Sequence, residues 1–258
     1  MPLRGFISLA LLGVFFVAGD LVQRTVIAAL VRLSPSSRER ILRRWVEWAA
    51  RMAIWTSSRI GGAKIDNQVA IPAEPGALIL MNHQSLLDIP VAFEFTTGGY
   101  SKVVTRTRYS RKIPLVSHML RLYGHPLVDP GRDVAAQLAR LRALAATTTH
   151  PLLIFPEGSR TRDGEIRPFR TAGLEAILAA RRWKVYVVVV EGLWNCAKLV
   201  DYVRNISSVR ARVESAGPFE SPGREEAPGP FIERMRGVMC DKLHEMRRRP
   251  TPRRAGQE

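Results

Sequence analysis

The sequence predicts an α/β fold, a layered sheet flanked by helices, preceded by an N-terminal membrane-associating helical segment. Three features support this prediction. After residue 62, short and nearly continuous apolar runs alternate with helical patterns, as in an α/β domain with a buried sheet. Before that residue lie two apolar runs and an amphipathic, tryptophan-rich stretch. The length of 258 residues, 46% of them hydrophobic, is sufficient for a large core.

The chain is strongly basic, with 39 Lys and Arg against 23 Asp and Glu and a formal charge of +16. Such a charge predicts an anionic partner: nucleic acid, phosphorylated metabolites or a membrane surface. The two cysteines, Cys196 and Cys240, exclude a disulfide framework and a four-thiolate zinc site. Because the histidines show no metal spacing with each other or with the cysteines, we expect no metal.

The N-terminal segment, residues 1–62, begins with apolar runs at 6–18 and 26–31. Neither run reaches the about 20 residues of a spanning helix. Joined together, they would place Asp20 and Arg24 near the middle of the bilayer, where each costs about 2.5–3.5 kcal/mol. We therefore expect a helix that enters or lies on the membrane. A signal peptide is the alternative, although nothing downstream resembles a disulfide-stapled secreted domain.

The tryptophan-rich stretch follows. Apolar residues recur in it at spacings of three and four, as in an amphipathic helix: Ile41, Trp45, Trp48, Met52 and Trp55. Arginines occupy much of the remaining surface. Aromatic side chains beside a basic face are typical of a helix at a membrane interface with anionic lipid. A core helix with a solvated arginine face is the alternative.

Residues 63–249 form the expected α/β domain, followed by a disordered basic tail at 250–258. The expected strands are apolar runs: 77–81, 102–105, 126–128, 152–155, 185–190 and 209–213. The expected helices lie between or after them: 86–95, 110–123, 132–146, 171–181 and 230–248. Residues 215–229 are rich in Pro, Gly and Glu, which predicts a loop.

The motif NHQSLLD, residues 82–88, lies where an expected strand ends and a helix begins. Ser85 and Asp88 have the spacing of a capping box, which is a purely structural interpretation. His83 precedes them, at the edge of the sheet where α/β domains place ligands. A carboxylate at Asp88 could hold one imidazole nitrogen and leave the other free as a general base.

The motif FPEGSR, residues 155–160, directly follows another apolar run. Gly158 lets the backbone approach a ligand, and turn amides bind anions. Arg160 offers a planar fork for phosphate. Arg162, Arg167 and Arg170 follow closely, which favours an anion site over a surface turn with an incidental arginine.

Together, the two motifs resemble the 1-acylglycerol-3-phosphate O-acyltransferase (glycerolipid acyltransferase) family, over roughly residues 76–192. The resemblance implies an enzyme that transfers an acyl group to a lysophospholipid, giving phosphatidic acid from 1-acylglycerol-3-phosphate. It implies that His83 and Asp88 are the catalytic pair. It implies substrate-binding roles for the acceptor motif, Glu157, Gly158, Ser159 and Arg160. The alternative acceptor is another lysolipid, for example a lyso-aminolipid.

The resemblance also implies no bound cofactor, with acyl-CoA or acyl carrier protein thioester as co-substrate. The other expected partners are anionic membrane lipids and the lysophospholipid. We expect the protein at the cytoplasmic face of the cell membrane, and we expect it not to bind nucleic acid. Two departures concern the acceptor: Pro130 stands where the family has an arginine, which Arg132 could replace, and the strand near residues 186–190 lacks the family's prolines.

A basic stretch at 101–128 remains open to several interpretations. It carries six basic side chains and no acidic one: Lys102, Arg106, Arg108, Arg111, Lys112 and Arg121. It could bind the phosphates of the thioester carrier, an acidic carrier protein or lipid headgroups, or be a solvated face. A non-catalytic protein that binds anionic membranes is the competing hypothesis for the whole chain, and a nucleic-acid binder is a weaker one because no recognised binding module is present.

Overall fold

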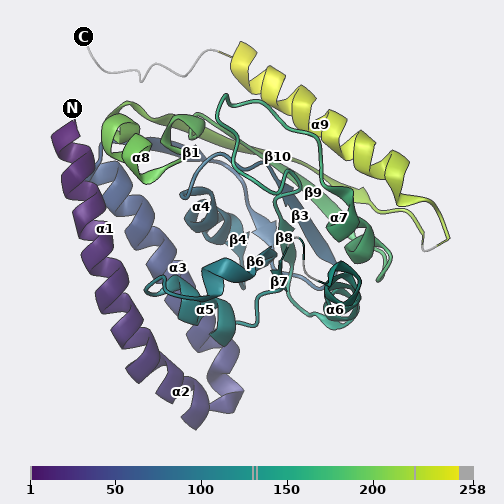
Figure 1. Cartoon of the computed structure of the whole chain (residues 1–258), viewed down its shortest axis with the longest axis horizontal. Helices are drawn as coiled ribbons and strands as arrows, with labels where there is room; N and C mark the ends of the chain where they lie inside the picture. Colours follow the sequence, from purple (N-terminus) through teal and green to yellow (C-terminus); the bar gives the residue numbers. More distant parts are fainter. Residues whose placement is uncertain (1, 130, 132, 224, 250–258) are drawn as a thin grey trace.

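A twisted central sheet organises the computed structural model, which describes residues 2–129, 131, 133–223 and 225–249 (Figure 1). In this described part the sheet has six strands in the order β1-β10-β9-β3-β8-β5. The strands are β1 Lys64–Asn67, β3 Ala77–Met81, β5 Lys102–Val103, β8 Leu152–Ile154, β9 Lys184–Glu191 and β10 Arg210–Glu220. β5, β8, β3 and β9 are mutually parallel, whereas β10 runs antiparallel to β9.

Alternating side chains of the strands enter two separate cores, one on each face of the sheet. Ile79 and Met81 of β3 belong to one core, and Leu78 and Leu80 to the other. All of β3 is buried, which explains why it appears in the sequence as a continuous apolar run rather than an alternating one. This is the buried sheet that the sequence predicts.

Helices cover both faces. The first core includes side chains from α1 Pro2–Val22, α3 Arg38–Trp55, α4 Asp88–Phe95 and α8 Leu199–Asn205, with α5 Val116–Leu122 packed beside them. The second includes side chains from α6 Val134–Thr147, α7 Thr171–Leu178 and α9 Pro228–Arg248. α9 lies across the sheet on the side away from α1 (Figure 1). The mixed α/β architecture with an N-terminal apolar helix is confirmed.

The N-terminal helix is one continuous helical run, Pro2–Leu33, through a π-helical turn at Gln23–Ile27 and α2 at Ala28–Leu33. By length and composition alone the run could cross a membrane. Many of its large apolar side chains are exposed: Leu3, Phe6, Ile7, Leu11, Val14, Val17, Leu21, Val22, Val26, Leu30 and Leu33. Asp20 and Arg24 pair within the helix at 2.8 Å. The boundary at residue 62 between the N-terminal segment and the α/β domain stays a prediction. Side chains of α3 and of the sheet belong to the same core.

Several elements differ from the sequence prediction. The expected strand at 126–128 is β7 Leu127–Val128, which pairs with β6 Thr105–Arg106 in a separate two-stranded sheet. β10 continues through much of the expected loop at 215–229, because its backbone pairs with β9 as far as Glu220. α5 begins six residues later than expected, since the residue before Pro114 is disfavoured in a helix.

Four further elements were not expected. These are the edge strand β1, the short pair β2 Ile71–Pro72 with β4 Thr96–Thr97, and the helix α8. The tail at 250–258, together with Pro130 and Arg132, lies outside the described residues.

Candidate active site

The carboxyl ends of four parallel strands meet at one edge of the sheet. The segments that follow β3, β8, β9 and β5 line a cavity of about 780 Å³ there. His83 follows β3, and Gly158, Ser159 and Arg160 follow β8. All four line this cavity. The two sequence motifs therefore meet, as expected for the ligand edge of an α/β sheet.

His83 and Asp88 form a hydrogen-bonded pair. Nδ1 of His83 lies 2.8 Å from Oδ2 of Asp88, which is fully buried. The imidazole stacks on the ring of Phe155, with centroids 4.1 Å apart. No hydrogen bond to Nε2 of His83 is found among the described residues, and the ring lines the cavity. The ring is thus held from one side and presents its second nitrogen to the cavity.

Asp88 also fulfils one half of the capping box that the spacing predicts; the other half differs, because the helix begins at Asp88 with Leu87 as its N-cap, and the Ser85 hydroxyl accepts the N–H of Leu87. The same Oδ2 accepts hydrogen bonds from the backbone N–H groups of Gln84 at 2.6 Å and Ser85 at 2.8 Å. The hydroxyl of Ser85 donates to the carbonyl of Cys196 at 2.9 Å. The two interpretations of Asp88 are therefore compatible: one carboxylate fixes the turn and the imidazole together.

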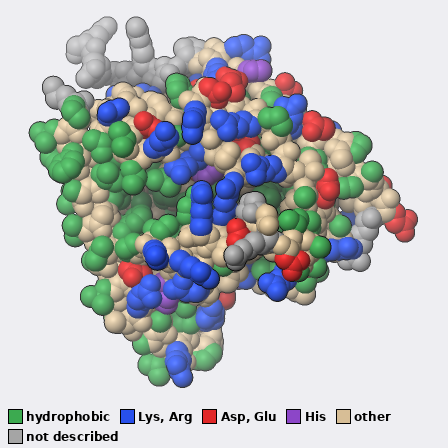
Figure 2. All heavy atoms as spheres, in the orientation of Figure 1, with side chains coloured by type: hydrophobic (Ala, Val, Ile, Leu, Met, Phe, Trp, Pro, Cys, Tyr) green, Lys and Arg blue, Asp and Glu red, His purple; other side chains and the backbone are tan. Residues whose placement is uncertain are grey.

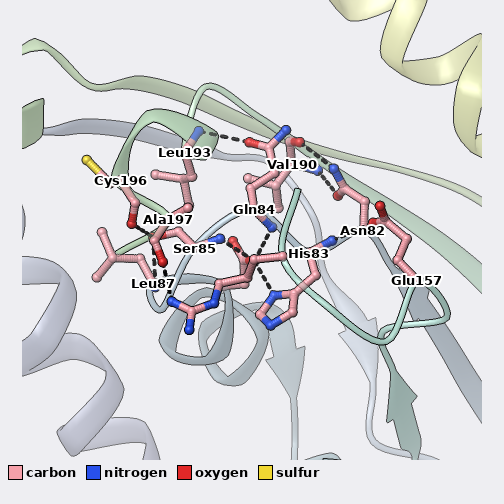
Figure 3. A network of polar contacts seen from close by, with 12 residues as sticks. Asn82, His83, Gln84, Ser85, Leu87, Glu157, Val190, Leu193, Cys196 and Ala197 are labelled. Carbon is pink, nitrogen blue, oxygen red and sulfur yellow. Dashed lines mark hydrogen bonds and ion pairs between the residues drawn. The ribbon is translucent and has the colours of Figure 1, made fainter. Parts of the chain in front are cut away.

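Two side-chain amides beside His83 were not identified from the sequence. Asn82 donates to the carbonyl of Val190 at 2.8 Å and accepts from its N–H at 2.7 Å, so its side chain extends the pairing of β3 with β9 (Figure 3). Gln84 accepts from the N–H of Leu193 at 2.9 Å. Both amides are buried. They fix the end of β3, and with it the position from which His83 projects.

Glu157 has a different position from its neighbours in the motif. Its two carboxylate oxygens each accept a backbone N–H at 2.9 Å, one from His83 and one from Arg167. Burial raises the pKa of this carboxyl, while the two hydrogen bonds lower it. Glu157 is 3% exposed and does not line the cavity. In this geometry it joins the His83 turn to the arginine-rich loop, and its substrate-binding role stays a prediction.

Gly158, Ser159 and Arg160 form the turn that faces the cavity. Gly158 has φ of +67°, the left-handed region that favours glycine. The N–H groups of Ser159 and Arg160, which follow it, have no hydrogen-bond acceptor within the described part of the chain. Arg106 donates to the carbonyl of Gly158 at 2.6 Å. The side chain of Arg160 also donates to the carbonyl of Ala197, which ties the turn to the segment after β9.

The cavity lining contains both basic and apolar side chains. Six of its lining side chains are basic: Arg106, Arg108, Arg160, Arg162, Arg170 and Lys198. Two are acidic, Asp129 and Asp201. Its apolar lining includes Val104, Val128, Val134, Leu138, Leu141 and Ile154. This composition fits an anionic group that carries a hydrocarbon chain. Arg106 and Arg108 come from the basic stretch at 101–128, but no sequence signal indicated Lys198.

The described residues do not favour a metal site or a cysteine nucleophile. No group of three or more His, Cys, Asp or Glu side chains there is arranged to hold a metal ion. Burial raises the pKa of the Cys196 thiol to about 12, so this cysteine is a poor nucleophile near neutral pH. The arginine at 132 that could replace the family's second-motif arginine is not among the described residues.

Comparisons with known proteins identify the family of the chain. The family model "Acyltransferase" matches residues 62–191, half of the chain. A solved structure with the same fold is the 1-acyl-sn-glycerophosphate (LPA) acyltransferase PlsC from Thermotoga maritima, at 18% identity and a TM-score of 0.66. The similarity covers 96% of this chain and 100% of the PlsC chain. No curated protein matches the sequence. The chain therefore belongs to the acyltransferase family of enzymes.

Proposed function

We propose that this acyltransferase moves a fatty acyl group from acyl-CoA or acyl carrier protein to the free hydroxyl of a lysophospholipid. The favoured acceptor is 1-acylglycerol-3-phosphate, and the product is then phosphatidic acid. The observation that carries the proposal is the juxtaposition, in one cavity, of the His83–Asp88 pair with a basic turn and an apolar lining. We place the reaction at the cytoplasmic face of the cell membrane.

His83 acts as the general base in this proposal. Its Nε2 takes the proton of the acceptor hydroxyl while the hydroxyl oxygen attacks the thioester carbonyl. Asp88, bonded to Nδ1, holds the tautomer that makes Nε2 basic and stabilises the imidazolium that forms. The tetrahedral intermediate then expels the thiolate, which takes the proton from Nε2. Such assistance contributes about 10²–10⁴ in rate.

The acceptor phosphate binds at the turn after β8. Arg160 supplies a planar pair of donors, and the N–H groups of Ser159 and Arg160, which have no acceptor among the described residues, supply two more. Arg162 and Arg170 also line this part of the cavity and add positive charge. A phosphate held there fixes the hydroxyl relative to His83, which converts an encounter into an intramolecular reaction.

The N-terminal helices hold the enzyme on the membrane. The exposed apolar side chains of α1 and α2 form a surface that favours lipid over water. Trp48 and Trp55 of α3 are also exposed, on a helix rich in arginine. Aromatic and basic side chains together favour the interface of an anionic bilayer. The lysolipid acceptor resides in that bilayer.

Product analysis tests the proposal. Purified protein is incubated in anionic vesicles with a panel of lysolipids and with acyl-CoA or acyl carrier protein thioesters, and products are identified by mass spectrometry. We expect acylation of the phosphate-bearing acceptor and its loss in His83→Ala, with His244→Ala on the exposed face of α9 as the matched control. Near-normal turnover in His83→Ala would refute the assignment of His83 as the general base. A preference for a lyso-aminolipid would show that the proposed acceptor is wrong, while the proposed acyl-transfer reaction would still hold.

A further inference from the structure

The loop between β8 and α7, residues 155–170, brings positive charge to the cavity. Three of the basic side chains that line the cavity belong to this β8–α7 loop: Arg160, Arg162 and Arg170. Lys and Arg side chains gather at the centre of the face that Figure 2 shows. The position of the loop therefore decides where these three charges lie.

Two backbone contacts hold the loop on either side of its middle part. The N–H of Thr161 donates to the carbonyl of His83 at 2.8 Å, and the N–H of Arg167 donates to Glu157 at 2.9 Å. Residues 162–166 lie between these two points, so a further contact is needed to fix their position.

Arg247 of α9 provides that contact. Its Nη1 donates to Oε1 of Glu165 at 2.5 Å, and its Nη2 donates to the carbonyl of Gly164 at 3.0 Å. Among the hydrogen bonds of the described residues, no other side chain from outside the loop reaches residues 162–166. The cavity-lining Arg162 belongs to this stretch, so its position depends on a helix from the far end of the chain.

The same guanidinium reaches the end of β9. Its Nε donates to Oε1 of Glu191 at 3.2 Å, and Oε2 of Glu191 accepts from the side chain of Gln84 at 3.5 Å. Gln84 directly follows His83 in the sequence. Arg247 therefore joins the β8–α7 loop to the strand end that supports the turn of His83.

Gly164 packs against both Arg247 and a side chain of the cavity wall. It is buried, with φ of +83°, and a Cβ there would lie 2.9 Å from Nη2 of Arg247 and 2.9 Å from Cδ1 of Trp194. Trp194 lines the cavity. Removal of the guanidinium therefore leaves space directly beside the loop backbone at the cavity wall.

The ion pairs of Arg247 are suited to fixing geometry rather than to stabilising the whole fold. The side chain of Arg247 is 30% exposed and that of Glu165 is 55% exposed, and exposed ion pairs contribute little to the free energy of unfolding. The planar guanidinium nevertheless holds its acceptors in defined directions.

We propose that Arg247 is a positioning residue of the acyl transfer: from α9 it fixes the β8–α7 loop against the end of β9, and so sets where the acceptor phosphate lies relative to His83. This inference rests on the proposed function, because that function places the acceptor phosphate at this loop. Arg247 itself does not line the cavity, so it acts through the residues to which it is hydrogen-bonded. Small displacements of a bound group slow a reaction strongly, even when the change lies far from the reacting atoms.

Hydrogen exchange read by mass spectrometry tests the contact without any need for turnover. We expect peptides that cover residues 158–168 to exchange faster in Arg247→Ala than in the native chain. Arg247→Lys keeps the charge but lacks the planar fork, so its exchange should lie between the two. The matched control is Arg236→Ala, which removes a similarly exposed arginine that pairs with Glu233 on the same helix and should leave the loop unchanged. Native exchange of the loop in Arg247→Ala would overturn the inference.

Steady-state kinetics separates positioning from a general loss of folded enzyme. We expect Arg247→Ala to raise the KM for the phosphate-bearing acceptor about ten-fold and to leave the KM for the thioester donor within about two-fold. A smaller folded fraction would lower the apparent kcat and change neither KM. Faster exchange of the loop together with a native KM for the acceptor would overturn the inference.

A double-mutant cycle shows whether Arg247 acts through the loop. Glu165→Gln added to Arg247→Ala should raise the acceptor KM little further, because the contact is already lost. Fully additive effects would overturn the inference. If the native chain acylates no lysolipid, the proposed function is wrong, while the hydrogen exchange still decides whether Arg247 fixes the loop.

Discussion

Asp88→Asn separates the two functions of the buried carboxylate. In the native chain Oδ2 of Asp88 accepts from Nδ1 of His83 and from the N–H groups of Gln84 and Ser85. The amide oxygen of asparagine can still accept these hydrogen bonds, so the turn keeps its acceptor. What is lost is the negative charge beside the imidazolium that forms during the reaction.

The structure sets the size of the effect. Oδ2 lies 2.8 Å from Nδ1, and two unit charges whose centres are about 4 Å apart attract by about 4 kcal/mol at an effective dielectric constant of about 20. Losing that stabilisation in the transition state slows the acyl transfer by about 10³. Asp88→Ala adds a structural cost, because the N–H groups of Gln84 and Ser85 lose their acceptor at about 1–3 kcal/mol each.

Single-turnover acyl transfer measures the chemical step, and urea unfolding measures stability. We expect Asp88→Asn to lose less stability than Asp88→Ala, because its amide oxygen keeps the acceptor of the turn, while its rate falls. Asp88→Ala should lose both stability and rate. A rate for Asp88→Asn within ten-fold of the native rate would refute the charge argument.

Three further predictions concern other buried or strained groups. Glu157→Gln turns an NH₂ group toward one of the two backbone N–H donors, so the free energy of unfolding measured in urea should fall by about 1–3 kcal/mol. An unchanged urea midpoint would contradict this prediction. Gly158 has φ of +67°, and a Cβ added there would lie 2.6 Å from Cδ of Arg170. We therefore expect Gly158→Ala to lower the free energy of unfolding by about 1–2 kcal/mol and to raise the KM for the phosphate-bearing acceptor. Equal KM values would contradict the proposal that this turn binds the acceptor. Burial lowers the pKa of His125 to about 3, so only its neutral form suits the folded state, and stability falls as the pH drops below about 6.5. His125→Gln should reduce the difference in unfolding free energy between pH 7 and pH 4 by about 3 kcal/mol in urea titrations. If the difference is the same in the variant and the native chain, burial of neutral His125 is not the cause of the pH dependence.

The strands that carry the site could be predicted because they are buried on both faces. β3, β8 and β9 appear as apolar runs for that reason, and the motifs follow them directly. β1 could not be predicted in this way: its residues are exposed or half-buried, and its partner β10 lies far along the chain. β10 was predicted too short because its pairing with β9 overrides the local signals of glycine and proline.

Within the site, local spacing predicted some contacts and missed others. His83 and Asp88 are separated by a single turn, so their hydrogen bond follows from the start of one helix. Glu157 was expected at the substrate, but its partners, His83 and Arg167, belong to two different loops. Asn82 acts through Val190, which lies 108 positions along the chain, so sequence patterns carry no trace of that contact.

The sequence by itself therefore determined the α/β class, the basic charge, the apolar N-terminal helix and the residues of the two motifs, because each depends on composition or on neighbours within one or two turns. Only the tertiary structure decided that the motifs share one cavity and that Lys198 and Arg106 join its basic lining. These features arise where parallel strands end side by side, and the order of strands in a sheet is set by long-range packing that no local pattern encodes.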